Sequence, residues 1–320
     1  MAPAPVRPDP VSRRELLGRI AAGTLALRSE TPVAPDARGL VVLEGQGIAS
    51  KPASGALARC NVPLVYDDKG GLFVDAKVAS RGPHRFVFDT GASRSTISTA
   101  MAEKLGLAVR EGEEIEGSAG TVKSGSAIAE LEVPGLGAMS VDFAVYAFAS
   151  YDAACVGIVG YELLRRAAWR VRYREKTLEW NAPAPAKRVE MTLDHRIPRI
   201  EALVNGRALP LRLDTGAAFP PGDDAYLNLT SDQAAALGLG GKPAAVLTAT
   251  GTGGATLELP VYRLQSLEVA GKALARSFAI VQPKVGYFAR ADAVGFLGNS
   301  VLDKLDPHVD YASERFGVGP

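Results

Sequence analysis

The chain has 320 residues, of which 47% are apolar and 22% charged, with a formal net charge of +1 at pH 7. Near-neutral charge without a Lys- or Arg-rich run excludes the usual nucleic-acid binder. Cys60 and Cys155 are too few for a disulfide framework, although a single bridge stays open, and the three histidines lack metal-ligand spacing. Abundant Gly and Pro favour short strands and turns. We therefore expect an all-β protein with short helices and two lobes, without metal or cofactor.

The N-terminal residues 1–58 are predicted to be a leader and linker. Within them, residues 12–18 contain Arg13 and Arg14, and a short apolar run follows at 20–27. This pattern resembles a twin-arginine export signal and predicts a periplasmic or exported protein. The alternative is a solvated amphipathic helix in a cytoplasmic protein, because no clear cleavage site follows the run. No other stretch approaches the ~20 apolar residues of a membrane span, so we expect no stable span beyond this segment.

The folded part is predicted to begin near Cys60. Residues 71–78 have the pattern of a strand, residues 81–84 that of a turn, and residues 85–88 that of a second strand leading into Asp89. The predicted unit is thus a strand, a turn and a strand that ends at an acidic residue.

The same order returns in the second half of the chain. Residues 198–204 form a predicted strand, Asn205-Gly206 is a strong hairpin signal, and residues 209–213 lead into Asp214. A Pro/Ala stretch at 181–186 separates the two halves. We therefore predict an N-terminal lobe at 59–182 and a C-terminal lobe at 183–320.

Further pieces recur in both halves in the same order. They are a helical segment (102–107 and 234–239), a Gly-rich hairpin (117–125 and 248–255), a Gly-containing apolar phrase (157–164 and 295–302) and a final strand (169–173 and 308–311). The second copy has seven extra residues between its aspartate and its helix, which we assign to residues 220–224. Repetition at this level predicts one structural unit used twice.

Each unit carries an Asp-Thr-Gly motif directly after an apolar strand. The residues are Asp89, Thr90, Gly91 and Asp214, Thr215, Gly216. A chain of this length holds on the order of 0.1 such motifs by chance. An isolated motif would be read as a turn, but a matched pair predicts two catalytic aspartates. Glycine is expected to permit an unusual turn geometry, and each threonine hydroxyl to bond across to the partner loop.

Two carboxyls brought together at such loops cannot both ionise, so they share one proton. The ionised carboxylate can activate water, and the protonated one can polarise a peptide carbonyl. Ala92 and Ala217 follow the motifs and offer no hydroxyl to the carboxylates. We therefore expect activity to be highest in mildly acidic solution, roughly pH 4.5–6.5.

The Gly-rich hairpins are predicted to cover the cleft and grip an extended chain. Their candidate substrate-binding residues are Gly120 and Thr121 in the first half and Gly251 and Thr252 in the second. The run at 251–254 is not read as a phosphate loop, because no Lys-Ser or Lys-Thr follows.

The chain resembles the retropepsin-like family of aspartic peptidases, with two units fused in tandem as in a single-chain bacterial type. The likeness covers about residues 60–318 and is carried by 86–93, 211–218, 158–160 and 296–298. It implies two β-barrel-like lobes related by pseudo-two-fold symmetry, an active site between them, and hydrolysis of peptide bonds in extended peptide or protein substrates. The insertion beside Asp214 and the lack of an obvious flap aromatic depart from the family pattern.

We expect an aspartic endopeptidase that works as a monomer through Asp89 and Asp214. One alternative is a catalytically silent peptide-binding protein on the same fold, and another is the pairing of halves from different chains. A Ser or Cys hydrolase using Cys60 or Cys155 with His84 is disfavoured, because neither a Gly-x-Ser-x-Gly elbow nor a cysteine-protease signature is present.

Overall fold

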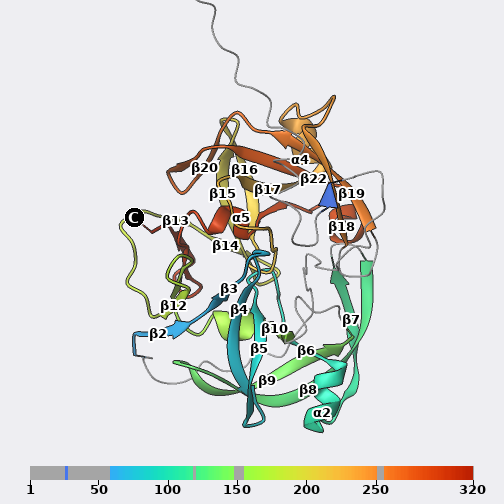
Figure 1. Cartoon of the computed structure of the whole chain (residues 1–320), viewed down its shortest axis with the longest axis vertical. Helices are drawn as coiled ribbons and strands as arrows, with labels where there is room; N and C mark the ends of the chain where they lie inside the picture. Colours follow the sequence, from blue (N-terminus) through green and yellow to red (C-terminus); the bar gives the residue numbers. More distant parts are fainter. Residues whose placement is uncertain (1–25, 28–57, 118–119, 148–154, 251–255, 320) are drawn as a thin grey trace, which may run out of the picture.

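The computed structural model describes residues 26–27, 58–117, 120–147, 155–250 and 256–319. Within these residues the protein is mostly strand, which confirms the predicted all-β class with short helices. The strands form three sheets. In Figure 1 the strands of the first half lie in the lower part and most strands of the second half in the upper part. The twin-arginine-like residues 12–18 lie outside the described residues.

The first sheet has eight strands in the order β3-β4-β5-β10-β6-β9-β8-β7, with an additional pairing between β4 and β8. Its members are β3 (Val65–Tyr66), β4 (Leu72–Val78), β5 (Arg81–Phe88), β6 (Thr96–Ser98), β7 (Arg110–Gly117), β8 (Gly120–Val133), β9 (Gly137–Tyr146) and β10 (Cys155–Val159).

The second sheet has eleven strands in the order β1-β18-β19-β22-β17-β23-β16-β15-β20-β21, and β14 also pairs with β15. Its members are β1 (Ala26–Leu27), β14 (Thr192–Asp194), β15 (Ile197–Val204), β16 (Arg207–Leu213), β17 (Ala225–Thr230), β18 (Ala245–Thr250), β19 (Thr256–Arg263), β20 (Leu267–Val269), β21 (Lys272–Leu274), β22 (Ser277–Gln282) and β23 (Gly295–Leu297).

The third sheet is built from both sides of position 183, in the order β13-β25-β24-β11-β12-β2. Its members are β2 (Cys60–Pro63), β11 (Trp169–Arg172), β12 (Thr177–Trp180), β13 (Arg188–Glu190), β24 (His308–Asp310) and β25 (Arg315–Gly317). The Pro/Ala stretch is fixed to this sheet, since Arg170 donates to the Pro183 carbonyl oxygen and His308 Nε2 to that of Ala182, each over 3.1 Å. The predicted division between residues 182 and 183 therefore falls in a segment that is bonded to this third sheet, which both halves share and which is called the shared sheet below.

Five short helical segments complete the described fold: α2 (Thr99–Leu105), α3 (Tyr161–Leu164), α4 (Ser231–Ala236), α5 (Asn299–Leu302) and the 3-10 turn η1 (Gly286–Ala289). The Ser98 hydroxyl caps α2 and the Thr230 hydroxyl caps α4, as expected for N-cap residues. No helix among the described residues combines the length and apolar character needed to cross a membrane.

The strand pairings around the two Asp-Thr-Gly motifs correspond one to one. In the first half β5 runs parallel to β10, β10 antiparallel to β6, and β6 parallel to β9. In the second half β16 runs parallel to β23, β23 antiparallel to β17, and β17 parallel to β22. The extra residues of the second copy lengthen both its loop and β17, because α2 is capped nine residues after Asp89 and α4 sixteen residues after Asp214.

One predicted turn lies two residues earlier than expected. The sequence placed it at 81–84, but β5 already begins at Arg81 and the turn is made by Ala79 and Ser80, with φ of 47° and 60°. A register shift between Ala76 and Val78 sets this position, and no sequence pattern marked it. The Asn205-Gly206 hairpin is confirmed, with φ of 50° and 76°, both in the left-handed region that such turns require.

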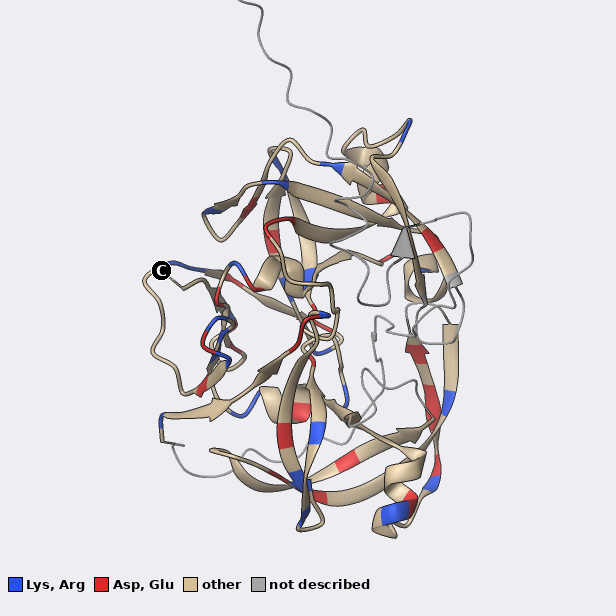
Figure 2. Cartoon of the chain, in the orientation of Figure 1, with Lys and Arg blue, Asp and Glu red and all other residues tan. Residues whose placement is uncertain are grey.

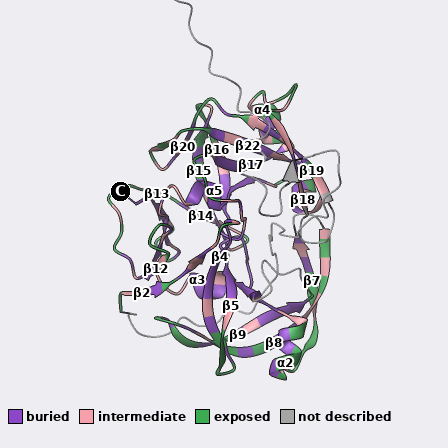
Figure 3. Cartoon of the chain, in the orientation of Figure 1, coloured by how far each residue is buried: buried purple, intermediate pink, exposed green. Residues whose placement is uncertain are grey.

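The core behind the first motif is aromatic. The ring of Phe88, the last residue of β5, meets the Trp169 ring edge-on at a centroid distance of 5.1 Å, and both side chains are fully buried. Trp169 lies in the shared sheet opposite Trp180. Figure 3 shows buried residues along the central strands β4 and β17. The strand that leads into Asp89 is therefore fixed by contacts with the third sheet as well as its own.

Candidate active site

Asp89 and Asp214 stand at matching places in the two sets of strands. The Asp89 backbone N–H donates to the Val159 carbonyl oxygen of β10 over 3.1 Å, and the Asp214 N–H donates to the Leu297 carbonyl oxygen of β23 over 3.0 Å. The side chains of both aspartates are buried, with 0% and 1% exposure. Each parallel strand pair thus holds one carboxyl at the end of a strand in the interior.

The structure brings the two motifs into contact. A Cβ atom added to Gly91 would lie 2.7 Å from Cγ of Asp214, and one added to Gly216 would be closer still to Cγ of Asp89. Each glycine therefore leaves room for the carboxyl of the other motif. The sequence reasoning expected these glycines to serve an unusual backbone geometry, but neither has a positive φ. Glycine is required at these two positions because of space: any side chain at Gly91 or Gly216 would displace the carboxyl of the other motif.

Thr90 and Thr215 tie the two loops together by reciprocal hydrogen bonds. The Thr90 N–H donates to the Thr215 hydroxyl over 3.0 Å, and the Thr215 N–H donates to the Thr90 hydroxyl over 3.0 Å. Each hydroxyl then donates onward, Thr90 to the Leu213 carbonyl oxygen over 2.8 Å and Thr215 to that of Phe88 over 2.7 Å. Because all four groups are buried, this network sets the relative position of the two carboxyls.

Replacing either threonine by valine is expected to lower the free energy of unfolding by about 2 kcal/mol, because the partner N–H and carbonyl groups lose their bonds in a buried site. Chemical denaturation of Thr90→Val and Thr215→Val measures this loss. Thr90→Ser is the matched control, since it keeps the hydroxyl while losing a methyl group. A valine variant as stable as the serine variant would show that the network contributes nothing.

Backbone groups hold one oxygen of each carboxyl. The Gly91 N–H donates to Oδ1 of Asp89 over 2.7 Å, and the Ala217 N–H donates to Oδ1 of Asp214 over 3.0 Å. The buried Oδ2 atom of each aspartate makes no hydrogen bond with the described residues. Each carboxyl is therefore oriented from the backbone through one oxygen.

Burial raises the pKa of both carboxyls. The pKa of Asp89 lies well above its usual value of 3.8, first because of burial and then because of the nearby Asp214 charge. Burial raises the pKa of Asp214 from 3.8 to about 7, although contact with the Asp89 carboxyl, the Ala217 and Gly216 N–H groups and, last, the Arg212 charge act in the opposite direction. The pair consequently holds a proton in mildly acidic solution.

Arg212 makes the surroundings of the two aspartates unequal. It stands two residues before Asp214, where the first half has the apolar Val87. Its side chain is 2% exposed, donates from Nε and Nη2 to Oδ2 of Asp194 over 3.0 and 2.9 Å, and lies over the Tyr287 ring. The sequence reasoning missed this residue because it compared only what the two halves share.

Two further polar residues support the loops and were also missed. The Asn299 amide donates to the carbonyl oxygens of Thr215 and Gly70, each over 2.8 Å, and accepts from the Tyr173 hydroxyl over 2.7 Å. In the first half, Glu162 accepts from the N–H and hydroxyl of Ser95. Glu162 lies in the repeated segment 157–164 and Asn299 in its counterpart 295–302. The repetition of these segments was the sequence signal from which both residues could have been predicted.

The hairpin of β7 and β8 packs toward both motif loops through apolar side chains. Ile115 of β7 belongs to a buried cluster with Val87 and Ala92. Val122 of β8 packs against that cluster, and so does Ala218 of the second motif loop. Of the residues chosen from the sequence, Gly120 is half-buried and Thr121 exposed on β8, while Gly251 and Thr252 lie outside the described residues. Glycine content pointed to the hairpin, but the residues that face the loops are apolar.

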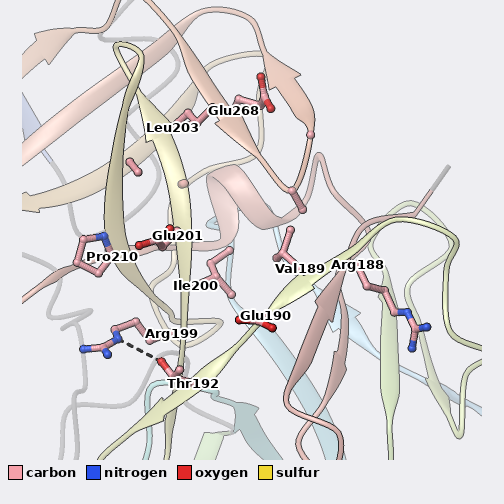
Figure 4. Close-up of a pocket in the computed structure, with 14 residues that line it drawn as sticks. Arg188, Val189, Glu190, Thr192, Arg199, Ile200, Glu201, Leu203, Pro210 and Glu268 are labelled. Carbon is pink, nitrogen blue, oxygen red and sulfur yellow. Dashed lines mark hydrogen bonds between the residues drawn. The ribbon is translucent and has the colours of Figure 1, made fainter.

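A concavity of about 750 Å³ lies beside β15 and β16. Figure 4 shows Arg199, Glu201, Leu203 and Pro210 around it, with Arg188 and Glu190 of β13 on the other side. Neither aspartate lines it, so this concavity is separate from the candidate active site.

Cys60 and Cys155 are both free thiols, so the bridge that the sequence left open is not formed. Cys60 lies on β2 of the shared sheet, whereas Cys155 is buried on β10 and donates to the Gly157 carbonyl oxygen. Within the described ranges, no group of three or more His, Cys, Asp or Glu residues is placed to hold a metal ion.

Comparison with known proteins gives a partial match. Residues 74–163 match a family model described as aspartyl protease, and this segment contains the first Asp-Thr-Gly motif. A search of curated proteins found no match. Among solved structures, the chain is similar to a retropepsin-like aspartic protease from Rickettsia conorii, with 18% identity over 40% of this chain and 86% of that one. The TM-score of this match is 0.28. The likeness to aspartyl proteases thus rests on the family match to residues 74–163.

Proposed function

We propose that this protein is an aspartic endopeptidase in which Asp89 and Asp214 form one catalytic dyad. The observation that carries the proposal is the mutual contact of the two motifs, in which each carboxyl lies against the glycine of the other. The aspartyl protease match of residues 74–163 supports the same class of activity. Peptides and proteins in an extended conformation are the proposed substrates.

In the proposed mechanism Asp214 is the base and Asp89 the acid. Asp214 takes a proton from water while the water oxygen attacks the peptide carbonyl carbon, and Asp89 gives its proton to the carbonyl oxygen. The tetrahedral diol then returns a hydroxyl proton to Asp89. The C–N bond breaks as Asp214 protonates the leaving nitrogen, so one water is consumed and both carboxyls regain their starting states.

The unequal surroundings of the dyad support this division of roles. Contact with the Asp89 carboxyl and the Ala217 and Gly216 N–H groups lowers the pKa of Asp214, and the Arg212 charge adds to this effect, whereas burial and the Asp214 charge raise the pKa of Asp89 well above 3.8. A group with the lower pKa is the one that is ionised when the pair holds a single proton.

We infer that the two halves are related by an approximate two-fold axis through the dyad and act together within one monomer. The corresponding strand pairings and the reciprocal threonine bonds support this arrangement. The division into lobes at 59–182 and 183–320, the monomeric state and export through the twin-arginine-like segment remain proposals. Sizing of the purified protein tests the monomer, since pairing of halves between chains would give a dimer.

Cleavage of a peptide library is the direct test of the peptidase function. We expect cleavage that a statine-type mimic of the tetrahedral intermediate inhibits, because the dyad binds that geometry most tightly. Thiol reagents are expected to leave the activity unchanged, because no thiolate takes part. Binding of the statine mimic without any cleavage would instead support a catalytically silent peptide-binding protein.

A further inference from the structure

The β7–β8 hairpin of the first half reaches across to the second half. Both strands contact η1, the short turn that follows β22. On the inner side of the hairpin, Ile115 packs among the residues around the first motif, and the Ala218 side chain of the second loop lies beside the same cluster. The hairpin therefore packs against residues beside both aspartates, on the first and the second motif loop.

An ion pair joins the end of this hairpin to the second half. Nη1 of Arg290 lies 3.4 Å from Oε2 of Glu116, the penultimate residue of β7. Arg290 directly follows η1 and is held from its own side, since its Nε and Nη2 donate to Oδ1 and Oδ2 of Asp292 over 3.0 and 2.8 Å. Its Nη2 also lies 3.3 Å from Nε2 of His195. The guanidinium is thus positioned by the second half, and Glu116 meets it from the hairpin.

Glu116 differs from the other glutamates of β7. The side chains of Glu111, Glu113 and Glu114 are exposed, whereas Glu116 is 32% exposed and Arg290 26% exposed. Figure 2 shows the acidic residues along β7. Only Glu116 among these four has an ion pair with the second half among the described residues.

We propose that Glu116 and Arg290 form a latch that holds the β7–β8 hairpin on the second half and sets how often the cleft opens. That the latch controls substrate entry rests on the peptidase function proposed above. That it holds the hairpin against the second half does not depend on that function. A pair with this exposure stabilises only modestly, so the latch opens thermally and is weakened by salt. Removing it is expected to increase the open population by roughly 1.5-fold to fivefold.

Hydrogen–deuterium exchange of peptides from β7 and β8 measures the open population directly. In Glu116→Gln these peptides are expected to exchange roughly 1.5-fold to fivefold faster, with no change in β15 or β16. The matched control is Glu114→Gln, the same substitution on the same strand at an exposed residue that faces Lys123 of β8. Rates in Glu116→Gln equal to those in Glu114→Gln would overturn the proposal.

A double-mutant cycle separates the latch from other roles of Arg290. Arg290→Gln alone also loses the contacts with Asp292 and His195, so its hairpin peptides are expected to exchange at least as fast as those of Glu116→Gln. Adding Glu116→Gln to it should produce no further increase, because the partner is already gone. Independent, multiplying effects of the two substitutions would show that the two side chains do not act as a pair.

Peptide cleavage by the same variants tests the gating part. Glu116→Gln is expected to change kcat/KM while Glu114→Gln does not, and added salt should bring the wild type toward the Glu116→Gln value. If the hairpin peptides of Glu116→Gln exchange faster but kcat/KM is unchanged, the ion pair holds the hairpin and does not control substrate entry. Absence of cleavage in the wild type would overturn the peptidase function and leave the exchange result standing.

Discussion

Replacing Asp89 by Asn is expected to lower kcat for peptide cleavage by roughly 10⁴-fold or more. Asparagine has nearly the shape of aspartate and can keep the Gly91 hydrogen bond, but it cannot give a proton to the substrate carbonyl. Asp214→Asn is expected to cause a loss of similar size, because an amide cannot take a proton from water. The measurement is kcat on a peptide cleaved by the wild type.

The double variant distinguishes a dyad from two separate contributions. When two residues act as one unit, removing the second after the first costs little more. We therefore expect Asp89→Asn/Asp214→Asn to be about as inactive as either single variant. Asp75→Asn is the control, since Asp75 lies on β4 and is 47% exposed beside Arg85. Losses that multiply in the double variant, or cleavage that survives either substitution, would contradict the shared site.

The strands around the two motifs could be predicted from the sequence, because the local signals there, apolar runs and turn residues, all indicate the same strands. Apolar runs end at Asp89 and Asp214, and Asn205-Gly206 marks a hairpin that the structure contains. The repetition of these signals also predicted that the motifs would correspond, as the matching strand pairings now show. Local pattern and repetition together were sufficient for the fold class and for the residues that the structure brings together.

The remaining features depend on contacts between segments far apart in the chain. The third sheet contains both β2 near residue 60 and β24 near residue 310, and no local pattern specifies the pairing of β11 with β24 that joins the two halves in it. The space that Gly91 leaves for Asp214 and the bond of Asn299 to Gly70 arise only when the two halves meet. Arg212 was missed for another reason, since it breaks the repetition on which the prediction relied.

Replacing Asp214 by Asn is expected to stabilise the protein near neutral pH, although it removes activity. The pKa of Asp214 is raised from 3.8 to about 7 in the folded protein, so the unfolded chain loses this proton more readily than the folded one. A raised carboxyl pKa leaves stability unaffected below about pH 4, lowers it progressively between about pH 4 and about pH 7, and leaves a constant penalty above that. The penalty is on the order of 4 kcal/mol once Asp214 is ionised in both states.

Asparagine cannot ionise, so the variant escapes this penalty and also relieves the electrostatic repulsion on Asp89. Urea denaturation at pH 4.5 and pH 7.5 measures the effect as the difference in the free energy of unfolding between variant and wild type. Comparing the two proteins at each pH cancels the contributions of other buried groups with shifted pKa values, such as Glu162 and His308. We expect a small difference at pH 4.5 and a stabilisation of several kcal/mol at pH 7.5. A variant whose advantage stays constant between the two pH values would mean that Asp214 is not a carboxyl forced to hold its proton by burial.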